Sequence, residues 1–209
     1  MFHYLQLTFT IGFSMENELG KNYWDNRYQQ NEIAWDIGAI STPLKEYFDQ
    51  ITNKSISILI PGCGNAYEAA YLLQIGFTNI TLADISPVVT AQVTVQLKEY
   101  VGKQLNIITG NFFELDQTFD LIIEQTFFCA LNPSLREKYV LKIKALLKPG
   151  GKLAGVLFNR TFAGGPPFGG NKEEYKSLFS KHFQKLQLAP CYNSIAPRMG
   201  SELFIIANN

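Results

Sequence analysis

The stretch that decides the fold is Ser55–Asp84, which reads SISILIPGCGNAYEAAYLLQIGFTNITLAD. It opens with the largely apolar run Ile56–Ile60, whose three isoleucines suit a strand that is buried on both faces of a parallel sheet. Pro61–Gly64 interrupts this run, and a helical pattern follows at once. A second apolar run, Ile80–Ala83, ends on Asp84. The stretch therefore predicts a strand, a glycine turn, a helix and a second strand that ends on an acid.

The limits of the predicted helix have recognisable signals. Asn65 is a good N-cap residue, and Glu68 follows three residues later, as in a capping box. Gly76 is placed to end the helix.

This unit is typical of a site for the adenosine half of a cofactor. Gly62 and Gly64 would let the backbone approach the ligand closely, and Asp84, 22 residues after Gly62, can accept hydrogen bonds from both ribose hydroxyls. A third glycine is missing, and Glu68 in the first helical turn would repel a pyrophosphate. We therefore expect S-adenosylmethionine, an adenosyl cofactor without phosphates, with an ordinary tight turn as the alternative.

Composition limits the classes of partner. The chain has 209 residues, of which 46% are apolar and 17% charged, which suits one α/β domain with a proper core. Lys plus Arg equals Asp plus Glu at 18 each, so no basic field favours nucleic acid. Cys63, Cys129 and Cys191 have no metal-ligand spacing, and their odd number argues against a disulfide framework. We expect no metal and a reducing, cytoplasmic compartment.

The first residues are treated separately. Met1–Ser14 is apolar but short, lacks Lys and Arg, and has no cleavage pattern, so it fits neither a signal peptide nor a membrane span. We expect an over-extended start or a disordered arm, followed by one domain over residues 15–209. No other apolar run reaches spanning length, so no membrane partner is expected.

The aromatic-rich segment 16–50, with helical spacing over Pro43–Ile51, is expected to cover the cofactor.

Strands and helices alternate through the rest of the chain. Further strands are predicted at Leu105–Thr109, Phe119–Glu124 and Leu153–Phe158. Ser86–Pro87 opens one helix, and a capping box at Ser134 opens another that ends at Pro149–Gly151.

The C-terminal part of the sequence departs from this alternation of strands and helices. Thr161–Asn171 contains GGPPFGG and is too long for a simple turn. A helix over Glu173–His182 precedes two strands, Phe183–Leu188 and Glu202–Ala207, that are joined too directly for a crossover helix. The predicted architecture is a doubly wound, Rossmann-like methyltransferase fold whose seven-stranded mixed sheet ends in an antiparallel hairpin.

Several motifs in one order resemble the thiopurine S-methyltransferase family, most closely its plant-type branch of thiol and halide methyltransferases. The resemblance runs from about Tyr23 to the C-terminus. Its pieces are Trp24, Tyr28 and Trp35 followed by Asp36 and Gly38, then LIPGCGNAYE, LADIS, GNFFEL, FDLIIEQTFFCALNP, LLKPGG and GGPPF.

The resemblance implies roles for individual residues. The cofactor would contact Trp24, Tyr28, Trp35, Gly62, Gly64, Asp84, Ile85, Asn111, Phe112 and Gln125. The three aromatic residues would cover its sulfonium. Asn111 and Phe112 would hold the adenine, although related sequences often have Asp where Asn111 stands. At Gln125 the branch more often has an aromatic residue.

The resemblance also implies a reaction. The enzyme would transfer the methyl group of S-adenosylmethionine in line to a small soft nucleophile: a thiol, a thiopurine-like heterocycle, thiocyanate or a halide. Positioning would suffice, without a catalytic acid or base, and His3 and His182 both lie away from the motifs. The substrate wall would comprise Phe127, Phe128, Pro166 and Phe168. Arg160 or Arg198 is a further candidate for this wall, with a surface or structural role as the favoured alternative for each. We expect a monomer or weak homodimer. A nicotinamide-dependent oxidoreductase and a non-catalytic S-adenosylmethionine-binding protein are the alternatives.

Overall fold

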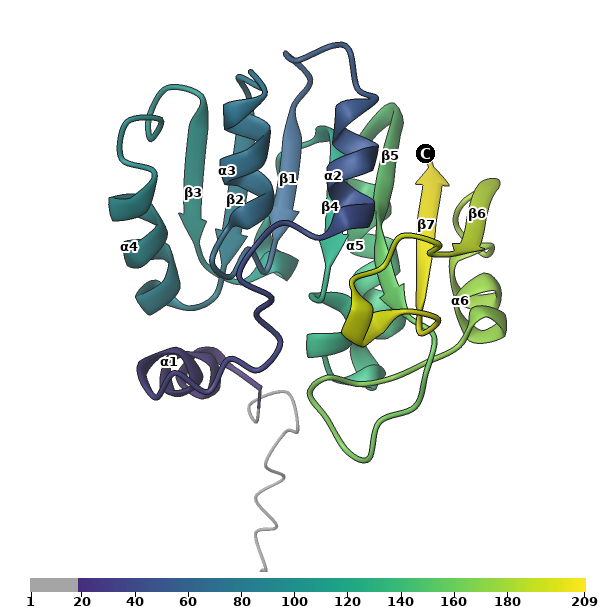
Figure 1. The fold of residues 1–209 in the computed structure, drawn as a ribbon. Coiled ribbons are helices and arrows are strands. Elements are labelled where there is room, and N and C mark those ends of the chain that lie inside the picture. Colours follow the sequence, from purple (N-terminus) through teal and green to yellow (C-terminus); the bar gives the residue numbers. More distant parts are fainter. Residues whose placement is uncertain (1–18) are drawn as a thin grey trace, which may run out of the picture.

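The computed structural model describes residues 19–209, so the expectation for Met1–Ser14 lies outside the described residues. Residues 19–209 form a seven-stranded sheet in the order β3-β2-β1-β4-β5-β7-β6 (Figure 1). β1 to β5 are parallel, and β7 pairs antiparallel with both β5 and β6. The predicted fold class, including the antiparallel C-terminal hairpin, is confirmed.

The order of the strands and of the helices from α2 onward along the chain agrees with the sequence analysis, whereas α1 and the 3-10 helices were not predicted. The strands are β1 Ile58–Pro61, β2 Ile80–Asp84, β3 Leu105–Thr109, β4 Phe119–Gln125, β5 Leu147–Phe158, β6 Lys185–Pro190 and β7 Glu202–Asn208. The α-helices are α1 Lys21–Gln29, α2 Thr42–Asp49, α3 Tyr67–Gln74, α4 Pro87–Gln96, α5 Arg136–Leu146 and α6 Lys172–Phe179. Short 3-10 helices are η2 Phe112–Glu114, η3 Phe128–Ala130, η4 Pro133–Leu135 and η5 Ala196–Arg198.

The sheet separates two hydrophobic cores. On one face α2, α3 and α4 contribute buried residues such as Leu44, Leu72 and Val93. On the other face α5 and α6 contribute residues such as Tyr139 and Phe179 (Figure 1). All residues of β1 and β2 are buried, because helices cover both sides of these central strands.

The covering segment is shorter than the expected residues 16–50. α2 belongs to the core, since Leu44 and Phe48 are fully buried and the helix packs against α3 and β5. α1 instead lies beyond the carboxyl ends of the parallel strands, at the lower edge in Figure 1. Only the part before α2 is therefore placed to cover a ligand at that edge.

Two predicted helix starts are wrong. α3 begins at Tyr67 after Ala66, which has φ 57°, and its N-cap has no side-chain hydrogen bond. The Asn65 amide instead donates to Asp36, a residue far away in sequence. The capping box at Ser134 does not form either, because the Asn132 side chain accepts a hydrogen bond from the Ser134 backbone and begins η4. At both positions the side chain that was expected to cap the helix forms a hydrogen bond with another residue instead.

β5 begins earlier than predicted. Leu147 already pairs with Phe119, and the register shifts before Lys152 pairs with Leu121. Gly151 makes this shift possible, because a Cβ atom there would lie 2.9 Å from the Phe119 carbonyl oxygen. The glycines therefore form an irregularity within the strand.

Candidate active site at the carboxyl edge of the sheet

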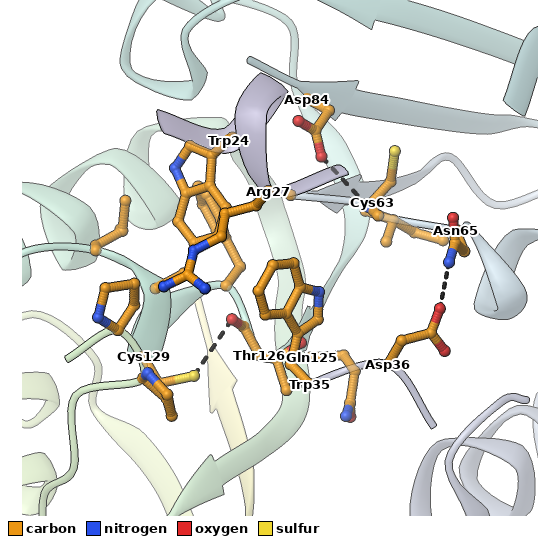
Figure 2. Close-up of a pocket in the computed structure, with 18 of the residues that line it drawn as sticks. Trp24, Arg27, Trp35, Asp36, Cys63, Asn65, Asp84, Gln125, Thr126 and Cys129 are labelled. Carbon is orange, nitrogen blue, oxygen red and sulfur yellow. Dashed lines mark hydrogen bonds between the residues drawn. The ribbon is translucent and has the colours of Figure 1, made fainter. Parts of the chain in front are cut away.

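A cavity of about 470 Å³ lies at the carboxyl ends of the parallel strands. Figure 2 shows side chains from the segment before α2, from the β1 and β2 ends and from the β4 loop around it. Its lining includes Phe127, Pro166 and all ten of the predicted cofactor residues, namely Trp24, Tyr28, Trp35, Gly62, Gly64, Asp84, Ile85, Asn111, Phe112 and Gln125. The fold thus brings residues from distant parts of the sequence to one place.

The turn after β1 requires its glycines. Gly62 has φ 59° and Gly64 has φ 48°, a left-handed region that residues with a Cβ atom rarely adopt. A Cβ atom at Gly62 would overlap the Phe127 ring, and one at Gly64 would lie 3.2 Å from the Tyr28 hydroxyl. The turn therefore makes close contact with the β4 loop and α1, and its backbone borders the cavity.

Asp84 ends β2 with its carboxylate at the cavity. The Ser86 backbone N–H donates to Oδ1 at 2.9 Å. The Gly64 backbone N–H donates to Oδ2 at 3.3 Å (Figure 2). Burial raises the pKa of Asp84, and these backbone hydrogen bonds oppose the rise. Each oxygen keeps lone-pair capacity, so the carboxylate can accept hydrogen bonds from a diol such as ribose.

Trp24, Tyr28 and Trp35 form one aromatic wall. The Trp35 ring makes edge-on contacts with Trp24 and Tyr28, at centroid distances of 5.6 and 5.9 Å. Arg198 Nη2 donates to the Trp35 carbonyl oxygen at 2.8 Å and so fixes the backbone there. Burial and the nearby Asp84 carboxylate raise the pKa of Tyr28, which keeps its hydroxyl protonated.

Two further acids line the cavity. The Asp36 carboxylate accepts hydrogen bonds from Asn65 and, at 3.2 Å, from the Tyr67 hydroxyl, which joins the covering segment to the start of α3 (Figure 2). Glu68 turns inward and is buried, and burial raises its pKa to about 7 although the Ser41 backbone N–H stabilises the charged form. Asp36 and Glu68 both stand in motifs quoted above, so the sequence contained a signal for their place at the cavity.

Asn111 and Gln125 are partly engaged by the protein itself. Asn111 Oδ1 accepts a hydrogen bond from the Phe113 backbone at 3.0 Å and begins η2. Gln125 Oε1 accepts one from the Ser41 hydroxyl at 3.2 Å. Each amide oxygen has a second lone pair, so a role toward the cofactor stays a prediction for both.

The loop after β4 is held by a buried carboxylate. Glu124 Oε1 accepts hydrogen bonds from the Phe127 and Phe128 backbones at 2.9 Å each, and Oε2 accepts one from the Tyr139 hydroxyl at 2.5 Å. Burial raises the pKa of Glu124 to about 7 despite these donors. Thr126, with φ 58°, completes the tight turn.

This turn sends its two phenylalanines in different directions. Phe127 lines the cavity, whereas Phe128 is 1% exposed and packs on Tyr139 and Tyr175 in the core. The placement of Phe128 on the substrate wall is therefore wrong, because its position in η3 turns it away from the cavity.

The loop after β5 supplies a wall that the sequence only partly located. Pro166 lines the cavity, but Phe168 does not, because its ring packs over Gly165 and its N–H donates to the Cys129 carbonyl oxygen at 2.7 Å. The sequence analysis did not assign Leu131, Phe158 and Phe162 to this wall. Leu131 stands in a motif quoted above, whereas Phe158 and Phe162 carry no motif that distinguishes them from core residues.

Three arginines reach the cavity. Arg27, which the sequence analysis did not single out, pairs with Glu32 at 3.1 Å. Arg198 pairs with Glu202 at 3.5 Å and lies over the Phe158 ring. Arg160 lies 4.8 Å over the Phe162 ring and has no carboxylate partner within residues 19–209. Arg160 and Arg198 stand on the β5 and β7 side of the sheet, opposite to Asp84 on β2.

The thiols at the cavity are unreactive. Burial raises the pKa of Cys63 and of Cys129, so both stay protonated near neutral pH.

Residues 19–209 contain no group of three or more His, Cys, Asp or Glu residues that could hold a metal ion. Within the same range no helix is long and apolar enough to cross a membrane.

The residues present fit S-adenosylmethionine. Asp84 suits the ribose hydroxyls, and the backbones of Gly62 and Gly64 border the cavity, where a ligand can approach them closely. The aromatic wall and the nearby acids Glu68 and Asp84 suit a ligand that carries positive charge on sulfur and nitrogen. The first turn of α3 carries Glu68, which disfavours a pyrophosphate at that helix end.

Comparisons with known proteins agree with this geometry. The sequence model of the thiopurine S-methyltransferase family matches residues 19–202. "Probable thiol methyltransferase 2" of Arabidopsis thaliana is 26% identical over 203 residues, which cover 95% of this chain and 89% of that protein. The thiopurine S-methyltransferase of Vibrio atlanticus (strain LGP32) is 29% identical over 175 residues, covering 76% and 80%.

Solved structures show the same fold at low identity. The 1,6-didemethyltoxoflavin-N1-methyltransferase of Burkholderia thailandensis, with bound S-adenosylhomocysteine, aligns with a TM-score of 0.68 at 20% identity, covering 90% of this chain and 86% of that one. The magnesium protoporphyrin IX methyltransferase of Synechocystis PCC 6803, with bound S-adenosylmethionine, gives 0.69 at 11% identity, covering 90% and 94%.

The match over residues 19–202 and the cofactor edge of the cavity lead to the same assignment. They replace the two alternatives that the sequence left open, the nicotinamide-dependent oxidoreductase and the non-catalytic binding protein. The chain belongs to the thiopurine S-methyltransferase family and is an S-adenosylmethionine-dependent methyltransferase.

Proposed function

We propose that this enzyme methylates a small, soft and anionic nucleophile: the thiolate of a thiol or thiopurine-like heterocycle, thiocyanate or a halide. The observation that carries the proposal is the composition of the cavity on the β5 and β7 side. Phe127, Phe158 and Phe162 make that wall apolar, and Arg160, which has no carboxylate partner within residues 19–209, adds positive charge to it. Such a surface favours a polarisable anion over a strongly hydrated one.

The chemistry needs little from an acid or a base. S-Adenosylmethionine supplies an activated methyl group on its sulfonium. A thiolate or thiocyanate is nucleophilic without help, so the chain has to orient it, hold it against the methyl group and exclude water. Two of the cavity acids are engaged by the protein itself, since Glu32 pairs with Arg27 and Asp36 is bound by Asn65. His182, the one histidine within residues 19–209, bonds Glu137 on α5 and does not line the cavity.

Protonated cavity thiols also favour this reaction. Because burial keeps Cys63 and Cys129 as thiols, neither competes with the acceptor for the methyl group. The enzyme can therefore hold a soft nucleophile beside its own sulfur atoms without methylating itself.

A matched pair of acceptors tests the proposal. Benzenethiol and phenol differ in the reacting atom, and 6-mercaptopurine, thiocyanate and iodide extend the panel. We expect release of S-adenosylhomocysteine with at least one sulfur or halide acceptor and none with phenol. Methylation confined to amines or hydroxyl compounds would contradict the proposal. Heat-denatured enzyme gives the background rate.

Assembly and compartment belong to the proposal as well. We propose a monomer or weak homodimer that binds no nucleic acid, since the net charge is zero. The free thiols of Cys63, Cys129 and Cys191 support action in the reducing cytoplasm. Light scattering at several concentrations measures the assembly state, and a stable tetramer would contradict this part.

A further inference from the structure

The helix that carries two of the aromatic cofactor residues has an unusual attachment. α1 supplies Trp24, Arg27 and Tyr28 to the cavity and packs mainly against α4. Within α1, Asp25 is the one fully buried residue, and among the apolar side chains of the helix only Tyr28, which is partly buried, packs against the core. Helices of globular proteins usually dock through a broader apolar face. The contacts of Asp25 therefore contribute to the position of α1 alongside the packing of Tyr28.

Asp25 bonds the beginning of α4. Its Oδ1 accepts a hydrogen bond from the Ser86 hydroxyl at 2.5 Å, and its Oδ2 accepts one from Lys21 at 2.7 Å. Burial alone would raise the pKa of Asp25, but the donors Lys21, Ser86 and the Val88 backbone N–H bring it below its ordinary value. The carboxylate is therefore ionised at neutral pH. It lies where the helix dipole of α4 favours a negative charge.

Ser86 connects this contact to the ribose-binding acid. It is fully buried and is the N-cap residue of α4. Its hydroxyl donates to Asp25, while its backbone N–H donates to Asp84 Oδ1. Ser86 thus forms hydrogen bonds both to Asp84 on β2 and to Asp25 on α1, the helix that covers the cavity.

We propose that Asp25 is a positioning residue for cofactor binding, which through Ser86 holds the aromatic face of α1 in register with Asp84. Neither Asp25 nor Ser86 lines the cavity, so neither acts by touching the ligand. The contact acts on the ligand by fixing the position of Trp24 and Tyr28. This inference concerns the cofactor alone and does not depend on which acceptor is methylated.

The test replaces Asp25 and measures the cofactor directly. Asp25→Ala removes a charged hydrogen-bond acceptor, and we expect the Kd for S-adenosylmethionine to rise by roughly 10- to 100-fold in isothermal titration. At saturating S-adenosylmethionine kcat should change little, so the effect appears in KM. Asn26→Ala alters the next residue of α1, which is exposed, and should leave the Kd within about twofold.

Fluorescence adds a readout of the helix position. The chain has two tryptophans, Trp24 and Trp35, and both belong to the covering segment. In Asp25→Ala their emission should shift to longer wavelength, because α1 exposes Trp24 when its attachment is lost. A Kd within about twofold of the parent, or an unchanged emission spectrum, would overturn the proposal even if the melting temperature fell, since the role would then be structural only.

A double-mutant cycle covers the case in which Asp25→Ala does not fold. Asp25→Asn keeps a carbonyl oxygen for the Ser86 hydroxyl and removes the charge, and Ser86→Ala removes the donor. If the two residues act together, Ser86→Ala raises the Kd by a smaller factor in the Asp25→Asn background than in the parent. Equal factors in the two backgrounds would overturn the proposal.

Discussion

Replacement of Asp84 gives the most direct test of the cofactor assignment. The carboxylate is 8% exposed and borders the cavity, where it can accept hydrogen bonds from both ribose hydroxyls. Hydrogen bonds to a charged group contribute about 1.5 to 3 kcal/mol. We therefore expect Asp84→Ala to raise the Kd for S-adenosylmethionine by roughly 10- to 150-fold in isothermal titration.

The same replacement should also destabilise the protein. The Ser86 and Gly64 backbone N–H groups would lose their acceptor, and each buried unsatisfied donor costs about 1 to 3 kcal/mol. For a chain of this size a loss of 2 to 3 kcal/mol lowers the melting temperature by roughly 5 to 10 °C. Asp84→Asn keeps one carbonyl oxygen for the Ser86 N–H, so its Tm should fall less while its Kd still rises.

Asp120 provides the matched control. It also accepts hydrogen bonds from a backbone N–H and a hydroxyl, both of Ser57, but it stands near the amino end of β4 and does not line the cavity. Asp120→Ala should lower the Tm and leave the Kd unchanged. If Asp84→Ala behaves like this control, with a lower Tm and an unchanged Kd, the ribose assignment is refuted.

Three further perturbations test other parts of the site. Trp35→Ala should weaken S-adenosylmethionine binding by about 1 to 3 kcal/mol through lost cation–π contact and burial, and an unchanged titration would show that Trp35 does not cover the cofactor. Pro166→Gly should lower kcat and leave the cofactor Kd nearly intact, because Pro166 lines the cavity on the side proposed for the acceptor; a parallel loss of cofactor affinity would show that this loop acts on the cofactor instead. Burial raises the pKa of Glu68 and Glu124 from 4.5 to about 7, so the folded chain binds these protons more tightly than the unfolded chain. Each of the two residues therefore adds roughly 3 kcal/mol to the free energy of unfolding at low pH. This contribution is fully present below about pH 4.5 and is lost as pH rises through about 7. Urea unfolding at about pH 5 and about pH 8 should therefore show a smaller pH dependence in Glu124→Gln than in the parent, and equal slopes would contradict this origin.

The cofactor side of the site could be predicted from the sequence because its signals are local. Gly62, Gly64 and Asp84 all lie on one strand–turn–helix–strand unit, and parallel strands bring their carboxyl ends to the same edge of the sheet. The antiparallel C-terminal hairpin also followed from the sequence, because its two strands are joined too directly for a crossover helix. Helix limits were less predictable, since Asn65 was expected to cap α3 but is taken by Asp36.

The acceptor side depended on the tertiary structure. Phe127 and Phe128 are identical neighbours in the sequence, and only the tertiary structure distinguishes them, because Phe128 packs on Tyr139 and Tyr175 in the core whereas Phe127 lines the cavity. Phe168 does not line the cavity, because its backbone N–H donates to the carbonyl oxygen of Cys129 on another loop. The contact of Asp25 with Ser86 likewise joins residues 61 positions apart. Local composition determines which segments become strands, turns and helices, whereas contacts between distant segments determine where each side chain points.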